Sequence, residues 1–253
     1  SKIIFAPCGF SRLNNVFYKN YFRKLSKKIK KFDLLIFHSK YYQDYKFASA
    51  NKAKKLKIIS NGANFKKEKL LVNKKKITII SEIKYNKGID RSLLSLLMSN
   101  LKNKQLDIYS QKTNYFFNFY YFYILLLSFL LKFKKINCKF HYNITGESLE
   151  KIRKRTYVLL FGSRLECSPL TLFESASSGC PFITFNSGNS YEISKLTGCG
   201  INVKSISEMT KKINLIYSNP DLRNRLSKNG IKNRSKFLWS KISDNYFKLI
   251  KSL

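Results

Sequence analysis

The stretch GSRLECSPLTLFESASSGCPFITFNSGNSYE, residues 162–192, decides the fold class of this chain. It reads as the end of a strand, a loop, a short helix, a second strand and a further loop. Ser168 and Pro169 are typical of a helix start, as the N-cap and the first helical residue. Gly179 can end that helix in the left-handed conformation, and the apolar run from Pro181 to Phe185 predicts the next strand.

Two carboxylates bracket this predicted helix, with Glu166 just before its start and Glu174 about two turns along. The backbone N–H groups of Leu170 and Thr171 have no helical partner, and the N-terminus of a helix attracts anions. Carboxylates that can bind hydroxyls and N–H groups that can bind phosphates are therefore expected close together, near the start of this helix. This pattern predicts a ligand that has both hydroxyls and phosphates. The simpler alternative is that the helix dipole alone favours Glu166.

The rest of the chain alternates short apolar runs with helical patterns, which predicts an α/β fold with parallel strands. We expect strand, helix, strand, helix and strand, in that order, at 3–6, 16–31, 33–38, 39–50 and 57–59. A charged connection at 66–76 then indicates a domain boundary. Beyond it we expect strands at 77–81, 106–109, 139–143, 157–161 and 201–203, and helices from Ile89, near Thr145, capped by Ser207, from Asn219-Pro220 and around Trp239. Ligands of open α/β sheets bind at the carboxyl ends of strands, which is where Glu166 falls.

The net charge of +35 over 253 residues is extreme. It is consistent with nucleic acid or an anionic membrane as partner, but lysines occur in almost every segment, which favours a plain lysine-rich composition. No nucleic-acid recognition motif is present, so we expect no nucleic-acid partner. Five cysteines without metal-binding spacing, and two histidines, indicate reduced thiols rather than a zinc site.

One segment, YFFNFYYFYILLLSFLLKF at 115–133, does not fit the alternation. A membrane-spanning helix needs about 20 apolar residues, so this run is borderline in length. A span here would put two halves of one sheet on opposite sides of a bilayer. We therefore expect a helix packed on the sheet, whose surplus aromatic residues face a membrane interface or a partner.

The run from Glu166 to Glu174 resembles the E-x7-E motif of retaining GT-B glycosyltransferases, most closely family 4 (glycosyl transferases group 1). Four further elements are similar to that family in the same order, and the helix around Trp239 resembles its usual tail. These elements are IISNGA at 58–63, KGID at 87–90, GCPF at 179–182 and NSGNSYE at 186–192. The resemblance covers nearly the whole chain.

The resemblance implies an α/β fold of GT-B type with Rossmann-like parallel sheets. Residues 1–72 would be the last part of an incomplete N-terminal, acceptor-side domain, and 73–235 the complete donor domain that binds the nucleotide sugar. Residues 236–253 would be a helix that crosses back to the N-terminal domain. Because the chain begins at Ser1, directly in an apolar strand, we expect an N-terminal part to be missing.

The resemblance also implies site residues. Glu166 and Lys87 would be catalytic: Glu166 holds hydroxyls of the donor sugar and Lys87 neutralises the diphosphate of the leaving group. Glu174 would accept hydrogen bonds from the ribose diol. Further donor-binding residues would be Leu170, Thr171, Ser168, Lys84, Gly188 and Asn189. We expect no cofactor and no metal, with the nucleotide sugar as substrate.

Simpler interpretations stay open for some of these residues. Lys87 is also typical of a solvated loop lysine, and Asn189 and Glu192 of helix-capping residues.

Four positions depart from the family pattern: Ser81, Glu82, Cys8 and Ser110. Family members usually carry a Gly-Arg pair where this chain has Ser81 and Glu82, and a carboxylate repels a diphosphate. Either Glu82 points away, or Lys84 substitutes for the arginine, or donor binding is weakened. Cys8 stands where many members have His, and Ser110 where a phosphate-loop Gly is common.

These observations favour an enzyme that moves a sugar, with retention of configuration, to an envelope glycan or lipid-linked acceptor of the lipopolysaccharide or capsule type. Such an enzyme would be cytoplasmic, and peripheral on the inner face of the cytoplasmic membrane. The alternative is a weak or inactive donor-binding module of the same fold, indicated by Glu82 and the short N-terminal part. A nucleic-acid-binding protein is a third and more distant reading, which rests on charge alone.

Overall fold

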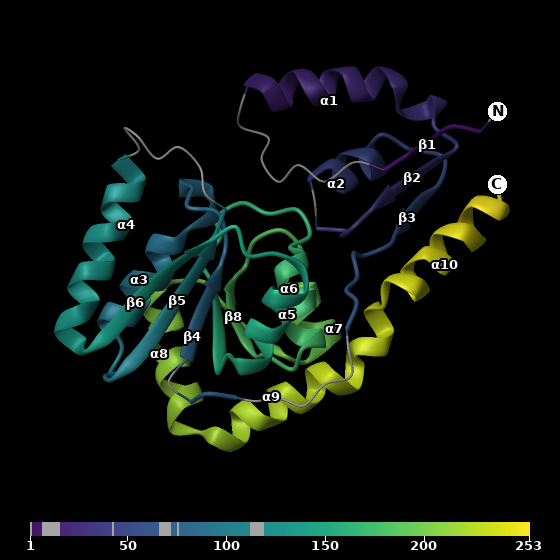
Figure 1. Ribbon diagram of the computed structural model, residues 1–253. Coiled ribbons are helices and arrows are strands. Elements are labelled where there is room, and N and C mark those ends of the chain that lie inside the picture. Colours follow the sequence, from purple (N-terminus) through teal and green to yellow (C-terminus); the bar gives the residue numbers. More distant parts are fainter. Residues whose placement is uncertain (1, 7–15, 42, 66–71, 75, 112–118) are drawn as a thin grey trace.

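The computed structural model describes residues 2–6, 16–41, 43–65, 72–74, 76–111 and 119–253. These residues form two β-sheets with helices packed against them (Figure 1). The smaller sheet has the strand order β1-β2-β3, and the larger has the order β6-β5-β4-β7-β8-β9. All strand pairs in both sheets are parallel, which confirms the predicted α/β fold.

The smaller sheet follows the predicted order of strands and helices. Its elements are β1 (Ile4–Phe5), α1 (Val16–Lys28), η1 (Ile29–Lys31), β2 (Leu34–Phe37), α2 (Gln43–Ala50) and β3 (Leu56–Ile58). Strand β2 is central and buried along its whole length, because all four of its residues are apolar and both neighbours are strands. Cys8 lies outside the described residues.

The larger sheet contains the rest of the predicted strands. Its strands are β4 (Lys76–Ile80), β5 (Lys104–Ser110), β6 (Ile136–Tyr142), β7 (Val158–Phe161), β8 (Phe182–Phe185) and β9 (Gly200–Val203). The helices are α3 (Ile89–Met98), α4 (Phe119–Leu130), α5 (Gly146–Arg155), α6 (Leu170–Ser177), α7 (Ser190–Thr197), α8 (Ile206–Ser218) and α9 (Pro220–Asn233). Counted from β4, the strand order is 3-2-1-4-5-6, the order of dinucleotide-binding Rossmann folds.

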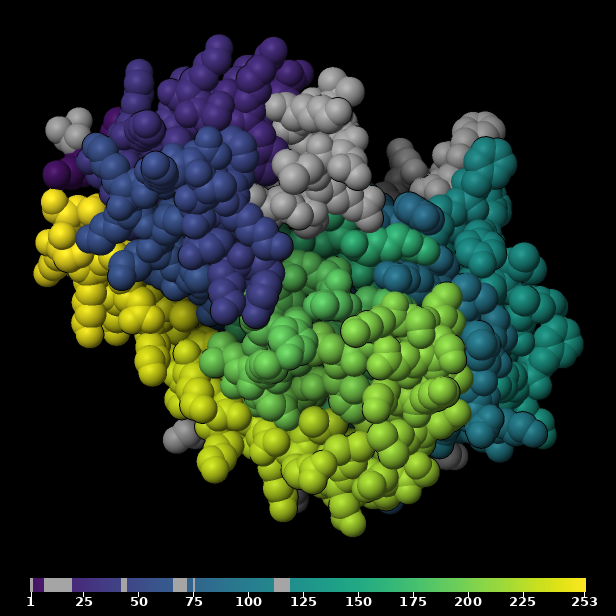
Figure 2. All heavy atoms as spheres, turned by 180° about the vertical axis from the view of Figure 1, so that it is seen from behind, coloured from purple at the N-terminus to yellow at the C-terminus, as the bar shows by residue number. Residues whose placement is uncertain are grey.

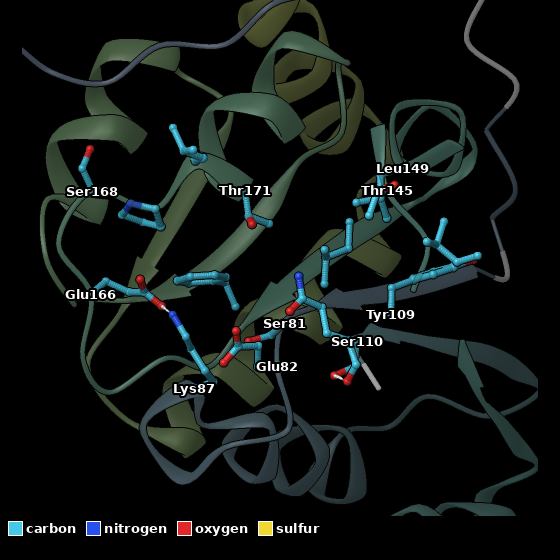
Figure 3. Close-up of a pocket in the computed structure, with 16 residues that line it drawn as sticks. Ser81, Glu82, Lys87, Tyr109, Ser110, Thr145, Leu149, Glu166, Ser168 and Thr171 are labelled. Carbon is cyan, nitrogen blue, oxygen red and sulfur yellow. Dashed lines mark hydrogen bonds and ion pairs between the residues drawn. The ribbon is translucent and has the colours of Figure 1, made fainter. Parts of the chain in front are cut away.

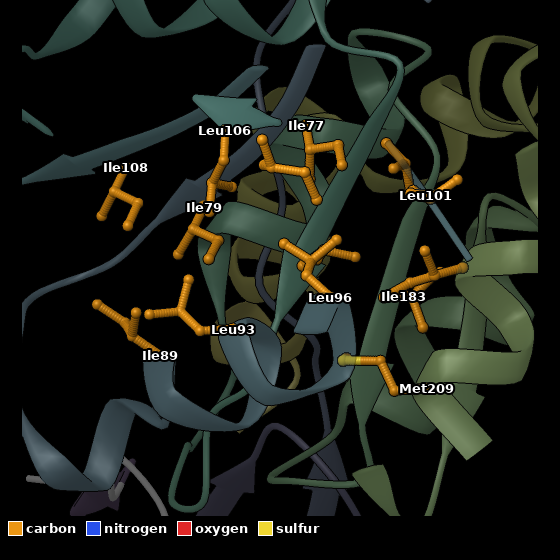
Figure 4. Close-up of a cluster of buried hydrophobic side chains, with 14 of the residues drawn as sticks. Ile77, Ile79, Ile89, Leu93, Leu96, Leu101, Leu106, Ile108, Ile183 and Met209 are labelled. Atoms are coloured by element: carbon orange, nitrogen blue, oxygen red, sulfur yellow. The ribbon is translucent and has the colours of Figure 1, made fainter. Parts of the chain in front are cut away.

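Strand β7 shows why the larger sheet is covered on both faces. Val158 and Leu160 belong to one core cluster, and Leu159 and Phe161 belong to another. In the first cluster, Leu93 of α3 and Met209 of α8 pack near the strands, as Figure 4 shows. Successive residues of a strand point to opposite faces, so a strand apolar at every position needs helices on both sides.

The C-terminal helix α10 (Trp239–Lys251) leaves the larger sheet and runs to the smaller one (Figures 1 and 2). Ile242 is buried against Leu34 and Ile36 of the central strand of the smaller sheet. At the start of this crossing the N–H of Ala63 donates to the carbonyl of Phe237 at 2.9 Å. The segment around Ala63, which follows the smaller sheet, therefore lies beside the residues that lead into α10.

Helix α4 and the 3-10 turn η3 (Leu131–Lys134) that follows it cover the predicted apolar segment from residue 119 onward, and residues 115–118 lie outside the described part. Ile124, Leu127 and Ser128 are buried, and the helix packs against α3, as expected for a helix lying on the sheet. Within the described residues, no helix combines the length and the apolar character that a bilayer crossing requires.

Two predicted N-caps are wrong. Helix α6 begins at Leu170, Pro169 occupies its N-cap position, and no side chain caps the helix. Ser168 instead accepts a hydrogen bond from Asn189 Nδ2 at 3.1 Å, because tertiary contacts hold this loop. Helix α8 is capped by Ser205 rather than Ser207, through the N–H of Glu208. Gly179 follows α6 in the predicted left-handed conformation.

Candidate functional site

The candidate site lies where the strand order of the larger sheet reverses, between β4 and β7. In an open sheet of this order, ligands bind in the crevice at the carboxyl ends of the strands where the order reverses. The loops after β4 and β7 touch through Gly88 and Gly162: a Cβ on Gly88 would lie 2.1 Å from the carbonyl oxygen of Gly162. Gly88 also has a φ of +60°, which glycine adopts without strain. Only glycines allow this close backbone contact.

A cavity of about 370 Å³ opens at this edge of the sheet (Figure 3). It is lined by the ends of β4, β5 and β7, by the loops after them and after β6, and by the start of α6. The polar lining residues are Ser81, Glu82, Lys87, Tyr109, Ser110, Gln111, Thr145, Glu166, Ser168 and Thr171. The family-pattern departures at Ser81, Glu82 and Ser110 therefore all fall on the cavity wall.

Lys87 and Glu166 meet in this cavity although 79 residues separate them in the chain. Lys87 Nζ lies 2.8 Å from Glu166 Oε1, and the two side chains are 26% and 11% exposed. The hydroxyl of Ser163 donates to the same carboxylate oxygen at 2.8 Å. Glu166 is thus oriented from two sides, and its second oxygen remains available to a ligand hydroxyl. The ammonium group of Lys87 can bind a phosphate of the ligand.

Glu82 lines the cavity, so it does not point away from it. Its carboxylate lies 2.6 Å from Lys84 Nζ, and Lys84 is not part of the cavity wall. Among the described residues that line the cavity, Lys87 is the one Lys or Arg, while Glu82 and Glu166 are both carboxylates. The side chains of the wall therefore carry an excess of negative charge.

The first turn of α6 faces the cavity through Leu170 and Thr171, together with Ser168 before it (Figure 3). The N–H of Leu172 bonds back to Pro169 at 3.2 Å. Glu174 lies further along the helix and is outside the cavity wall. Its carboxylate accepts a hydrogen bond from Arg153 of α5, whose burial lowers the pKa of the guanidinium against the opposing effect of Glu174. Arg153 thereby fixes the side of α6 that carries Glu174.

Gly188 and Asn189 line a neighbouring cavity, together with Tyr41, and not the cavity of the Lys87–Glu166 pair. Gly188 has a φ of +56°, and a Cβ there would lie 2.3 Å from the carbonyl oxygen of Cys167. The N–H of Asn189 donates to the same oxygen at 3.1 Å. This loop therefore holds the backbone between Glu166 and Ser168 in place. Asn189 occupies the N-cap position of α7, but its side chain makes no capping bond.

Ser168 joins the two units. Asn61 Nδ2 of the smaller unit donates to the Ser168 carbonyl at 3.1 Å, and Asn189 Nδ2 contacts both the Ser168 hydroxyl and the His38 carbonyl. Glu192 lies beside Ser39 in the same region, and burial raises the pKa of its carboxyl against the opposing hydrogen bond from Ser39. The wall of the cavity is thus in contact with the smaller unit.

An ion pair clamps the two loops that carry Lys87 and Glu166. Arg164 donates to both oxygens of Asp90, at 2.8 and 2.6 Å, and stacks over the ring of Tyr85 with 4.2 Å between its Cζ and the ring centroid. The hydroxyl of Tyr120 on α4 donates to the same carboxylate at 2.8 Å. Burial alone would raise the pKa of Asp90, but the bonds from Arg164 and Tyr120 outweigh it and hold the pKa below its ordinary value.

The backbone completes this clamp. The carbonyl of Asn86 accepts from the backbone N–H of Arg164 at 2.9 Å and from that of Leu165 at 3.2 Å. The sequence indicated no role for Ser163 or Arg164, and it placed Asn61 only in the IISNGA element, without a contact to Ser168. The sequence offered two signals, Asp90 in the KGID element and the charged Arg164 shortly after a buried strand. Neither signal indicates which residue the side chain contacts.

The fold and part of the sequence match known glycosyltransferases. Residues 126–233, less than half of the chain, match the family model described as glycosyl transferases group 1. A search among curated proteins gives no significant match.

Several solved structures are similar over almost the whole chain. Sucrose-phosphate synthase from Thermosynechococcus elongatus superposes with a TM-score of 0.74 at 18% identity, over 92% of this chain and 61% of that one. Anabaena HepE in complex with UDP gives 0.82 at 13% identity, over 100% and 72%. A UDP-forming trehalose-phosphate synthase from Burkholderia xenovorans gives 0.73 at 12% identity, over 98% and 68%.

This chain thus spans 61% of the length of the sucrose-phosphate synthase and 72% of that of HepE. At these identities the similarity shows the fold alone. The parallel sheets, their strand order and the solved structures agree: the chain has the GT-B fold, and residues 126–233 are similar to the glycosyl transferases group 1 family.

Proposed function

We propose that this chain is the donor-binding part of a glycosyltransferase that takes a sugar from a nucleotide-sugar donor. The observation that carries the proposal is the Lys87–Glu166 pair, held beside the start of α6 in the cavity at the strand-order reversal. A lysine, a carboxylate and free helix N–H groups suit a ligand with both phosphates and hydroxyls. HepE, which has the same fold, was solved with UDP, and this supports a uridine nucleotide as the first donor to test.

In the proposed reaction the bond between the anomeric carbon and the β-phosphate oxygen breaks. The acceptor oxygen bonds to the anomeric carbon on the same face, so that configuration is retained, and its proton passes to the leaving phosphate. Lys87 and the N–H groups at Leu170 and Thr171 stabilise the charge that builds on this phosphate. Glu166 orients hydroxyls of the donor sugar, and Glu174 those of the ribose. The proposal includes no cofactor or metal, because the lysine and the helix N-terminus supply positive charge.

We further propose that the acceptor is an envelope glycan or a lipid-linked precursor of the lipopolysaccharide or capsule type. The high positive charge and the aromatic helix α4 suit an acceptor held at an anionic membrane. The protein would then act on the cytoplasmic side, as a peripheral protein of the inner face. A panel of lipid-linked acceptors, with and without the lipid, tests this part separately from donor binding.

Replacing Lys87 with glutamine is expected to weaken UDP binding about tenfold, because a charge-assisted bond to a phosphate contributes on the order of 1.4 kcal/mol. Isothermal titration calorimetry of the chain with UDP measures this. Lys211→Gln, on the exposed side of α8, removes the same charge away from the cavity and should bind like the original chain. Equal weakening by both substitutions would mean that Lys87 has no particular contact with the nucleotide.

A specific observation favours a second candidate function, a donor-binding module with little or no transfer activity. Glu82 adds a carboxylate to the wall where family members usually have arginine. Sugar transfer measured with UDP-sugars separates the two: transfer that is lost in Glu166→Gln supports the enzyme, whereas UDP binding without any transfer supports the module. If neither UDP nor GDP binds, the donor-site proposal itself is wrong.

A further inference from the structure

Helix α4 is apolar on all sides, yet only one side of it is covered. A helix that is hydrophobic all round is normally buried in a core or in a membrane. Here one side packs against α3 through Ile124 and Leu127, and the other side faces solvent. We define the α4 aromatic face as the large apolar residues of α4 and the following turn that are more than 40% exposed: Phe119, Phe122, Tyr123, Leu126, Phe129 and Phe133.

This face is fixed in place by contacts on its other side. The Tyr120 hydroxyl donates to the buried carboxylate of Asp90, and burial raises the pKa of Tyr120 well above its ordinary value. Leu127 and Leu131 belong to the main core cluster of the larger sheet. The helix therefore cannot rotate to hide its outer side without breaking these contacts. The exposure is a property of the folded state.

The surroundings of the α4 aromatic face are basic. Residues 119–142 contain lysines at 132, 134, 135 and 139 and no Asp or Glu. Lys132 and Lys135 are exposed at the C-terminal end of the helix. Lys132 Nζ lies 5.5 Å from the centroid of the Phe129 ring, so charge and aromatic surface adjoin. These apolar side chains with lysines beside them are complementary to a surface that has an apolar interior and negatively charged groups on its outside.

The position of the helix relates this face to the cavity. Figure 1 shows α4 at the outer edge of the larger sheet, with its N-terminal end at the same edge as the carboxyl ends of β5 and β6. Those strand ends supply Tyr109 and Ser110 to the cavity wall, and the loop after β6 supplies Thr145. A surface that binds the α4 aromatic face near Phe119 would therefore lie next to the cavity mouth.

We propose that the α4 aromatic face binds the surface of an anionic lipid bilayer. Aromatic and leucine side chains enter the boundary between headgroups and acyl chains, and lysines at the border attract acidic headgroups. A bilayer fits better than a protein partner, because the cations border the apolar residues and no carboxylate occurs in the segment. This inference deepens the proposed function and rests on it for its purpose, which is to bring a lipid-linked acceptor to the cavity.

Flotation with vesicles of phosphatidylcholine alone and with added phosphatidylglycerol tests the proposal. We expect the chain to float with the anionic vesicles, and Leu126→Glu and Phe129→Glu each to reduce the bound fraction at least tenfold. Phe247→Glu is the matched control: Phe247 is 65% exposed on α10, away from α4, and its substitution should leave binding unchanged. Lys132→Gln with Lys135→Gln should reduce the preference for the anionic vesicles and leave the fold intact.

Thermal unfolding and UDP calorimetry accompany each variant. A variant that still unfolds at the original temperature and binds UDP, but no longer floats, supports the proposal. Absence of flotation by the original chain overturns it, as does flotation that Leu126→Glu leaves unchanged. Sedimentation showing a dimer that Leu126→Glu dissociates, without lipid binding, would assign the face to a second copy of the chain instead. If the original chain floats but does not bind UDP, the donor-site proposal is wrong and the proposal for the α4 aromatic face still holds.

Discussion

Replacing Asp90 with alanine is expected to lower the free energy of unfolding by about 3–5 kcal/mol, the range for removing one partner of a buried ion pair. The side chains of Asp90 and Arg164 are only 9% and 19% exposed, so the Arg164 charge would be left without its carboxylate in a largely dry position. Tyr120 would lose its acceptor as well. Urea unfolding at neutral pH measures the difference.

The same variant predicts a pH dependence. The pKa of Asp90 is below its ordinary value in the folded chain, so the pair stabilises the fold above the unfolded carboxyl's pKa of about 3.9. This contribution is lost as the pH falls through the lowered folded pKa. The stability difference between Asp90→Ala and the original chain should therefore shrink in acid. Asp244→Ala, at an exposed position of α10, should change stability by less than about 0.5 kcal/mol.

The Asp90 variant also tests whether the clamp positions the site. Arg164 and Asn86 hold the two loops together, and Lys87 and Glu166 stand on those loops. If the clamp positions the pair, UDP affinity of the folded variant falls although neither Asp90 nor Arg164 contacts the ligand. Unchanged affinity in a destabilised variant would restrict the clamp to a structural role.

Replacing Glu82 with arginine is expected to tighten UDP binding about tenfold to a hundredfold. The change removes one negative charge from the cavity wall and adds a positive one. Two unit charges about 5 Å apart interact by roughly 3 kcal/mol at an effective dielectric constant near 20, and solvent reduces this because the Glu82 side chain is 36% exposed. Calorimetry with UDP at fixed ionic strength measures the gain.

Two further variants separate local from global effects of charge. Glu82→Gln should give part of the gain, since it removes the repulsion without adding a cation. Asp244→Arg changes the net charge by the same amount on α10, away from the cavity, and should leave UDP affinity unchanged. Weaker or equal UDP binding by Glu82→Arg would show that a diphosphate does not bind beside Glu82. A gain in affinity together with new transfer activity would identify Glu82 as the residue that limits donor binding.

The strands and helices could be predicted because each carries its own local signal. The run from Tyr157 to Phe161 is apolar at every position, and only a central strand covered on both faces accommodates that pattern. Gly179 and Asn219 mark a helix end and a helix start through the preferences of their own backbone and side chain. Ser168 does not cap α6, because its hydroxyl accepts a hydrogen bond from Asn189 that outweighs its local preference for capping.

The site could be predicted only as far as parallel strands constrain it. Lys87 and Glu166 follow two strands of one parallel sheet, so their loops had to lie at the same edge, and the structure places them 2.8 Å apart. The partners of Asp90 could not be read in the same way. Arg164 is 74 residues away, and nothing in the spacing indicates which of many basic residues would reach that carboxylate.

In this chain the order of residues decided the local elements, the α/β class and the residue types that reach the carboxyl edge of the sheet. Local preferences and hydrophobic periodicity act over a few residues and can therefore be recognised in the sequence. The tertiary structure alone decided that Glu82 faces the cavity, that Asp90 clamps the site, and that α4 leaves one aromatic side uncovered. These outcomes depend on the distances between segments that are far apart in the chain. Packing determines those distances, and no local sequence pattern indicates them.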